Sequence, residues 1–217
     1  LETNTNLYTV MAYAGHAELK NSWDVDGDGD YEWQEDDRLY ATKPSINDIK
    51  AIQYIYGMTP EYNHGDTEYI YEGPVYDTIY DTGGIDSIDL SSYTLNITLN
   101  LNGGTVSYIG TNELWITKPS AVGSSDSYWG SSGFPISISE NTIIENAILG
   151  DGDDTITCNL AVNSITCNLG NDTVYNIDTG DTIYGGGGND IFALSSINFA
   201  SIDGGEGVDQ ISFEDAD

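Results

Sequence analysis

Residues 149–192, LGDGDDTITCNLAVNSITCNLGNDTVYNIDTGDTIYGGGGNDIF, contain a nine-residue repeat that decides the fold. One polar position recurs every nine residues: Asp154, Asn163, Asp172, Asp181 and Asp190. Two residues after each of them comes an apolar side chain: Ile156, Ile165, Val174, Ile183 and Phe192. A sixth copy, residues 204–209, follows after one extra residue and ends in Asp209.

This repeat matches the pattern G-G-x-G-x-D-x-U-x, which is typical of a parallel β-roll. A short strand with one inward apolar side chain cannot bury itself, so successive strands must stack into coils. Glycine gives the turns between strands the positive φ they need, and the turns present carbonyl oxygens and an Asp carboxylate to calcium. The alternative is a Gly/Asn-rich linker, but a linker does not require copies at a constant nine-residue spacing. We predict a calcium-binding β-roll over residues 149–217.

Consecutive turns of such a roll alternate between its two edges, so turns eighteen residues apart stack together. One edge carries these turns: 149–154, 167–172, 185–190 and, after the one-residue slip, 204–209. The other edge carries these: 158–163, 176–181 and 194–199.

The two edges differ in their potential calcium ligands. Turns of the first edge end in Asp and keep a Gly two residues before it, whereas the second edge has one turn ending in Asn163 and one ending in Phe199. We therefore predict calcium along the first edge only, with Asp178 and Asp181 as solvated turn residues. The predicted ligands are Gly150, Gly152, Asp154, Gly170, Asp172, Gly186, Gly188, Asp190, Gly205, Gly207 and Asp209.

A second acidic motif lies at residues 24–35, DVDGDGDYEWQE. Its residues fit positions one, three, five, six, seven and twelve of an EF-hand-type loop: Asp24, Asp26, Asp28, Gly29, Asp30 and Glu35. The carboxylates can surround a hard cation, and the glycine makes the sharp turn. The alternative is a solvated acidic loop, because flanking helices are weakly marked. We predict a single calcium site here, with Asp24, Asp26, Asp28, Asp30 and Glu35 as ligands.

The rest of the chain divides into two regions by texture. Residues 1–60 contain one good helix signal, at 46–56, which Pro44 and Ser45 open and Gly57 ends. Residues 61–148 contain short alternating runs separated by Gly-rich turns, as in antiparallel or sandwich strands. The predicted fold is mainly β: a β-sandwich-like domain that continues into a parallel β-roll, with one short α-helix near the N-terminus.

Charge and composition exclude several function classes. The 217 residues include 36 acidic and 5 basic ones, for a net charge of −31, which disfavours nucleic acid and anionic membranes as partners. Two explanations of this charge are possible: a solubilising or halophilic surface, or carboxylates that bind divalent cations. The placement of Asp in Gly-punctuated turns favours cations. No apolar run is long enough to span a bilayer, and no signal peptide is recognisable.

Five segments follow one another in a characteristic order: Thr9–Tyr13, 48–57, 65–67, 81–89 and 144–148. Together they resemble the C-terminal half of a serralysin, a family of secreted bacterial zinc metalloproteases with calcium-binding RTX repeats. Within them, Thr9–Tyr13 is similar to the family's Met-turn. The resemblance makes residues 1–60 the remnant of a protease-like subdomain. It also implies metal ligands in the segment 81–89, at Gly83, Asp86 and Asp89.

The family's zinc helix, H-E-x-x-H-x-x-G-x-x-H, is absent, since the only histidines are His16 and His64. We therefore expect no zinc in this chain. The leading hypothesis is a non-catalytic calcium-binding module, secreted by one-step bacterial export without a cleaved signal peptide, whose partners are a larger polypeptide or the export apparatus. The alternatives are the C-terminal part of an active zinc endopeptidase and a surface or adhesive module.

Overall fold

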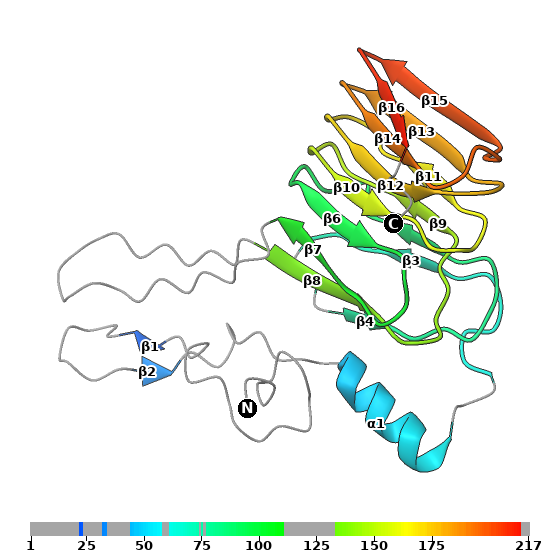
Figure 1. Cartoon of the computed structure of the whole chain (residues 1–217). Helices are drawn as coiled ribbons and strands as arrows, with labels where there is room; N and C mark the ends of the chain where they lie inside the picture. The colour runs from blue at the N-terminus through cyan, green and yellow to red at the C-terminus, as the bar shows by residue number, and fades with distance from the viewer. Residues whose placement is uncertain are drawn as a thin grey trace.

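Figure 1 shows the chain as a computed structural model in which two sheets face each other along a stack of coils. The structure describes the backbone of residues 22–23 and 32–33, and residues 44–57, 61–73, 75, 77–110 and 133–213. Within these ranges it is mainly β with one helix. The predicted mainly β fold with one short helix is confirmed.

Most strands belong to the two long sheets. The six-stranded sheet has the order β15 (Ser201–Glu206), β13 (Thr182–Gly187), β11 (Ser164–Thr166), β9 (Asn146–Ile148), β5 (Ser87–Asp89) and β3 (Glu68–Ile70). The eight-stranded sheet has the order β16 (Gln210–Phe213), β14 (Ile191–Leu194), β12 (Thr173–Ile177), β10 (Thr155–Thr157), β6 (Ile97–Asn100), β7 (Val106–Gly110), β8 (Gly133–Ile138) and β4 (Asp77–Ile79). A separate antiparallel pair joins β1 (Ser22–Trp23) and β2 (Glu32–Trp33).

From β9 to β16, consecutive strands alternate between the two sheets, as the nine-residue repeat predicts. Residues eighteen positions apart pair in parallel register, for example Ile156 with Val174 and Ile165 with Ile183. The apolar residue of each of the first five repeats is at most 1% exposed: Ile156, Ile165, Val174, Ile183 and Phe192. One inward side chain per strand therefore builds a continuous core between the sheets, which confirms the predicted β-roll.

The region 61–148 differs from the antiparallel sandwich that its alternating runs suggested. Strands β3, β5 and β9 pair in parallel and continue the six-stranded sheet of the roll without a break. The connections 80–86 and 90–96 are about as long as the repeat turns, so the chain winds through the same coils without the repeat consensus. Antiparallel pairing is confined to β6, β7 and β8 within this region.

Helix α1 (Ile46–Tyr56) begins and ends at the predicted residues and lies at the lower end of the stack (Figure 1). Ser45 caps it: the Asp48 amide donates to Ser45 Oγ, and the Ser45 amide donates to Asp48 Oδ2. Gly57, with φ +84°, ends it. Across the described residues, no helix is both long and apolar enough to cross a membrane.

Because the turns stack closely, some positions in them require glycine. We expect Gly188→Ala to lower the free energy of unfolding by about 2–4 kcal/mol, because the new Cβ would overlap the Gly170 carbonyl oxygen in a residue with φ +139°. Gly187→Ala is the matched control, since its Cβ would meet only the flexible tip of Leu169, at 3.1 Å. Denaturant unfolding checks both. Equal losses for the two variants would contradict the stacking argument.

Candidate metal centre

The acidic turns of the first edge are linked by a ladder of hydrogen bonds from one turn to the next. The amide of Ile97 donates to Asp154 Oδ1 (2.7 Å), and the amide of Asp154 donates to Asp172 Oδ1 (2.8 Å). The same bond joins Asp172 to Asp190 Oδ1 (2.9 Å) and Asp190 to Asp209 Oδ1 (3.1 Å). Each Asp thus ties its own turn to the turn below, and the predicted stacking at eighteen-residue intervals is confirmed.

The second carboxylate oxygen of three ladder residues has no hydrogen-bond partner. These atoms are Oδ2 of Asp154, Asp172 and Asp190, and all three residues are 1% exposed. An ionised carboxylate that is buried without a partner costs several kcal/mol, so it must take up a proton or a cation. The edge therefore presents a column of acceptor oxygens that the protein itself leaves unsatisfied.

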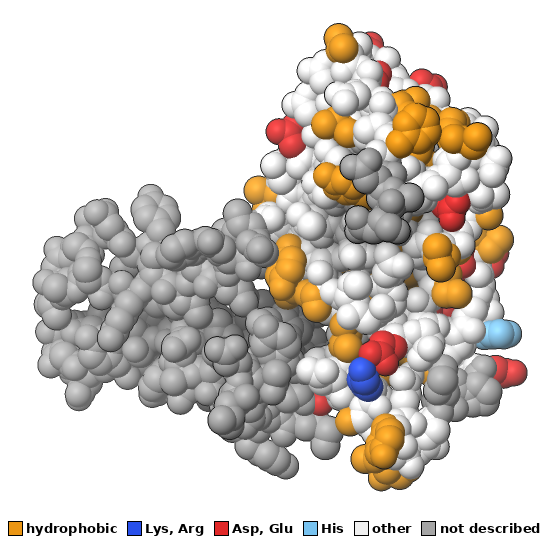
Figure 2. Space-filling model, in the orientation of Figure 1, with side chains coloured by type: hydrophobic (Ala, Val, Ile, Leu, Met, Phe, Trp, Pro, Cys, Tyr) orange, Lys and Arg blue, Asp and Glu red, His pale blue; other side chains and the backbone are white. Residues whose placement is uncertain are grey.

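No basic side chain of the roll is available to neutralise this column. All Lys and Arg residues of the chain precede residue 119, whereas the ladder lies within residues 149–209. Figure 2 shows the same imbalance on one face: acidic colour is spread along the coils, and basic colour, among the described residues, appears only at the lower end. Compensation must therefore come from protons or from ions in solution.

The pKa values of these carboxyls reflect the missing partners. Burial, with the charges of neighbouring acidic residues, raises the pKa of Asp154 and of Asp172 to about 7. For Asp172 the neighbouring charges are those of Asp154 and Asp190. Burial and the charge of Asp209 also raise the pKa of Asp190. Protons and cations compete for such a site, because either of them relieves the buried charge.

Backbone carbonyl oxygens point along the same edge. A Cβ on Gly170 would overlap the carbonyl oxygen of Gly152, and one on Gly188 would overlap that of Gly170. The glycines thus let each turn approach the carbonyl groups of the turn below. Within the described ranges, no three or more His, Cys, Asp or Glu side chains are arranged so that they could hold a metal ion by themselves. An ion on this edge would need both carbonyl and Asp oxygens, the ligands that calcium prefers.

Within the repeats, the second edge of the roll is satisfied by the protein itself. Asp181 is fully buried, so the prediction that it is a solvated turn residue is wrong. Its Oδ1 accepts from the Asn163 amide and its Oδ2 from the Asp178 amide, both at 2.8 Å. Asn163 Oδ1 in turn accepts from the Asn159 amide (3.1 Å). These side chains complete their turns without an ion, in contrast to the first edge.

A further orphaned oxygen, Asp86 Oδ2, lies on the second edge below the repeats. Asp86 Oδ1 accepts from the Thr67 amide (2.9 Å), and the Asp86 amide donates to Glu145 Oε2 (2.7 Å). Burial, together with the charges of Asp81 and Glu145, raises the pKa of Asp86 to about 6. Gly83, in the same connection, donates its amide to Asp81 Oδ1 (2.9 Å).

Sequence reasoning found only part of this lower cluster. Gly83 and Asp86 lie together as predicted, but Asp89 lies at the far end of β5, where its Oδ1 accepts from the Ser91 amide. Asp81 and Glu145 were missed. Glu145 stands nine residues before Asp154, in the Asp position of the repeat, so the spacing alone could have identified it.

Two short strands lie at and within the acidic segment 24–35. Strand β1 lies just before it and β2 lies inside it, with Ser22 paired to Trp33 and Trp23 paired to Glu32. The predicted ligands themselves lie outside the described residues: Asp24, Asp26, Asp28, Asp30 and Glu35.

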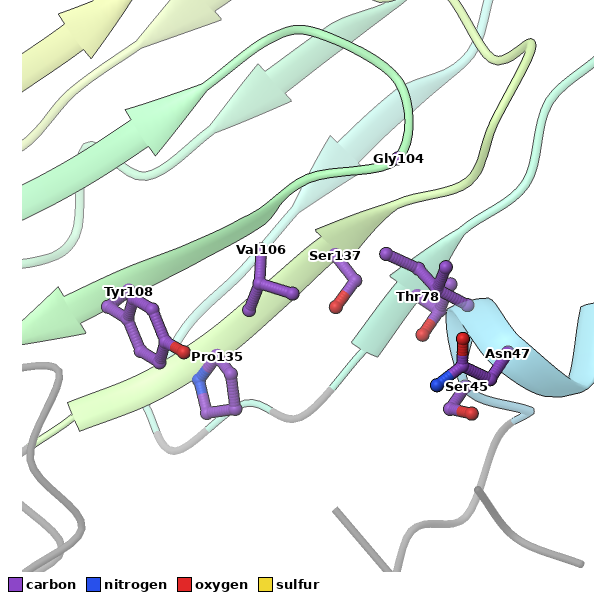
Figure 3. Close-up of a pocket in the computed structure, with 9 residues that line it drawn as sticks. Ser45, Asn47, Thr78, Gly104, Val106, Tyr108, Pro135 and Ser137 are labelled. Atoms are coloured by element: carbon purple, nitrogen blue, oxygen red, sulfur yellow. The ribbon is translucent and has the colours of Figure 1, made fainter. Parts of the chain in front are cut away.

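The pocket in Figure 3, about 200 Å³ in volume, lies between the start of α1 and the outer face of the eight-stranded sheet. Among the described residues, its lining includes Ser45, Asn47, Thr78, Tyr108 and Pro135, and contains no His, Cys, Asp, Glu or Lys. These residues offer no carboxylate, imidazole or thiolate to a metal ion. The candidate site therefore remains the acidic edge of the roll.

Comparison with known proteins shows which proteins this chain is similar to. The chain is 30% identical over 176 residues to a serralysin of Photorhabdus laumondii, covering 75% of this chain and 30% of that protein. It is 29% identical over 176 residues to metallopeptidase AprA of Pseudomonas marginalis, covering 75% and 31%. The chain corresponds to the C-terminal β-roll region of a serralysin-type protease. No family model matches it.

Three of the serralysin-like segments lie together in the structure. Residues 65–67, 81–89 and 144–148 meet at the lower cluster, where Thr67 and Glu145 both bond to Asp86. The serralysin-like chain spans less than a third of the length of the relatives named above. Met11 and Tyr13, of the segment similar to the Met-turn, lie outside the described residues.

The raised pKa values make a pH prediction for the calcium-free protein. Between about pH 4 and pH 7, folded Asp154 and Asp172 hold protons that the unfolded chain releases, so stability falls as pH rises. We expect the melting temperature in calcium-free buffer to be about 5–10 °C lower at pH 8 than at pH 5. The double variant Asp154→Asn/Asp172→Asn should flatten this dependence. A melting temperature that is higher at pH 8 would refute the assignment.

Proposed function

We propose that this chain is a non-catalytic calcium-binding module whose β-roll is completed by calcium along the first edge. The observation that carries the proposal is the column of buried, unpartnered Oδ2 atoms on Asp154, Asp172 and Asp190, in a roll without a single Lys or Arg. Divalent cations match this need, since they bring two charges and accept carboxylate and carbonyl oxygens together.

In this proposal calcium lies between stacked turns of the first edge. One ion bridges Asp154 with Asp172, another bridges Asp172 with Asp190, and a third reaches Asp209. Gly150, Gly152, Gly170, Gly186, Gly188, Gly205 and Gly207 let the turns approach closely and supply carbonyl groups. A further ion fits the lower cluster at Gly83 and Asp86, with Asp81 and Glu145 beside it. The acidic segment at 24–35 is an additional calcium candidate.

Calcium binding is coupled to folding, because the stacked turns exist only in the folded chain. A site that binds only the folded state contributes about 2.7 kcal/mol when free calcium is 100 times its Kd. Sites of extracellular type have Kd values of about 10⁻⁴–10⁻³ M. The roll would therefore stay open at cytoplasmic calcium levels and close outside the cell. This fits bacterial one-step export of an unfolded chain, with the export apparatus as partner.

The relatives favour a second candidate for the parent protein. They are named serralysin and metallopeptidase, and the chain covers only 30% and 31% of the two quoted above. The module would then be the C-terminal part of a larger secreted zinc endopeptidase. A His-Glu-x-x-His motif in the reading frame upstream of Leu1 would support this candidate, and further β-domains there would oppose it.

Calcium dependence distinguishes the two edges of the roll. We expect millimolar calcium to raise the melting temperature by more than about 10 °C over EGTA, and Asp172→Asn to abolish most of that rise, since Asp172 borders two proposed ions. Asp181→Asn is the matched control, because Asp181 is equally buried but already has hydrogen-bond partners. Calorimetric melting measures the difference between calcium and EGTA for each protein. No difference in the unmodified chain would eliminate the proposed function.

The isolated chain should have no peptidase activity, even with added zinc. A catalytic zinc needs about three protein ligands and a water, whereas this sequence has only His16 and His64 and no His-x-x-x-His pair. Release of labelled peptides from casein is the measurement, with a chelator-treated sample as blank. Cleavage above the blank that Tyr13→Phe abolishes would show that a zinc centre exists.

A further inference from the structure

One turn of the first edge carries a side chain where its neighbours have none. Asn168 is the second residue of the turn 167–172, and the equivalent residues of the other three repeat turns are Gly150, Gly186 and Gly205. Its backbone is left-handed, with φ +70°, a conformation that asparagine adopts more readily than most residues. The turn thus keeps the backbone that Gly186 and Gly205 share, with φ +102° and +88°, but adds an amide.

A side chain at this position projects into the gap between two turns. A Cβ on Gly186 would overlap the carbonyl oxygen of Asn168 in the turn below, and a Cβ on Gly205 would overlap that of Gly186. The Asn168 amide follows this direction: its Nδ2 donates to the carbonyl oxygen of Leu149 (2.7 Å), in the turn below. The side chain therefore lies between the turns 149–154 and 167–172.

The main chain is arranged differently in this gap. Between the next two turns, the Gly187 amide donates to Asn168 O and the Gly170 amide donates to Gly187 O, both at 2.8 Å. No main-chain hydrogen bond joins residues 150–153 to residues 168–171 in the structure described above. In their place stands one side-chain bond, from Asn168 Nδ2 to Leu149 O.

We infer that Asn168 weakens the calcium site between the first two turns and replaces part of the ion's role there. The inference rests on the proposed calcium-binding function of this edge. The Nδ2 hydrogens of Asn168 already occupy a lone pair of the Leu149 carbonyl oxygen in this gap. These hydrogens carry partial positive charge, which would repel an entering cation. Calcium must displace this bond before it binds between Asp154 and Asp172. The site between Asp172 and Asp190 has no such competitor, because Gly186 carries no side chain.

The same bond holds the first two turns together without metal. Calcium-free chain would therefore keep the coil around Leu149 and Asn168 closed, and the coils above it would depend on ions. Asn168 thus divides the first edge into a lower part that its side-chain hydrogen bond stabilises and an upper part that calcium stabilises.

Calcium titration by calorimetry tests this inference with the full chain and Asn168→Gly. We expect the weakest binding step to tighten about tenfold in Asn168→Gly, because one competing hydrogen bond is removed. The melting temperature in EGTA should fall in the same variant. Asn176→Gly is the control for replacing a left-handed asparagine away from the first edge, since Asn176 has φ +59° on the other edge. It should leave every calcium step unchanged.

The site is assigned by repeating Asn168→Gly in an Asp154→Asn background, where the tightening should disappear. If Asn168→Gly weakens a binding step, Asn168 is itself a calcium ligand and the inference is wrong. If it changes neither binding nor calcium-free stability, the inference is also wrong. Absence of calcium binding in the unmodified chain would instead refute the proposed function on which it rests.

Discussion

Buried carboxylates without protein cations are the constraint on which the rest of this structure depends. Each repeat ends in a polar residue that is drawn into the stack, because its Oδ1 must accept the amide of the turn below. That bond fixes the register of the coils but leaves the second oxygen in a dry environment. The chain has no Lys or Arg after residue 118, so the roll cannot neutralise the buried carboxylates that fix its register. Its stability is therefore linked to the ions and protons of the medium.

The two edges accommodate their buried polar side chains in different ways. On the second edge, Asp181 points both oxygens at main-chain amides, and Asn163 avoids the charge altogether. Within the repeats, this edge needs no ion. On the first edge, glycines let each turn approach the carbonyl oxygens of the turn below, and the carboxylates keep one oxygen without a partner. If calcium binds there as proposed, a roll with one edge of each kind keeps its register on one side while the other side responds to calcium.

How much could be read from the sequence depended on the repeat. Nine-residue spacing gave the alternation of sheets, the inward residues and the composition of each edge, because a coil of fixed length leaves little freedom. Helix α1 was equally clear from Ser45 and Gly57. The parallel pairing of β3, β5 and β9 was missed because turns without glycine consensus resemble ordinary loops. Glu145 was missed because Glu stands in the place of the repeat Asp, and the hairpin at β1 and β2 because two-residue strands carry no pattern.

Glycine content along the stack indicates which coil relies most on ions. Apolar burial is even over the five repeats, since Ile156, Ile183 and Phe192 are all at most 1% exposed. Hydrophobic stabilisation, at about 25 cal/mol per Å² buried, therefore does not distinguish these coils. Glycine content does distinguish them, because it is highest at Gly185–Gly188 and glycine costs more backbone entropy to order than other residues. The coil that contains Gly185–Gly188 thus has the highest entropic cost, so it has the greatest need for the charge compensation that we propose calcium supplies.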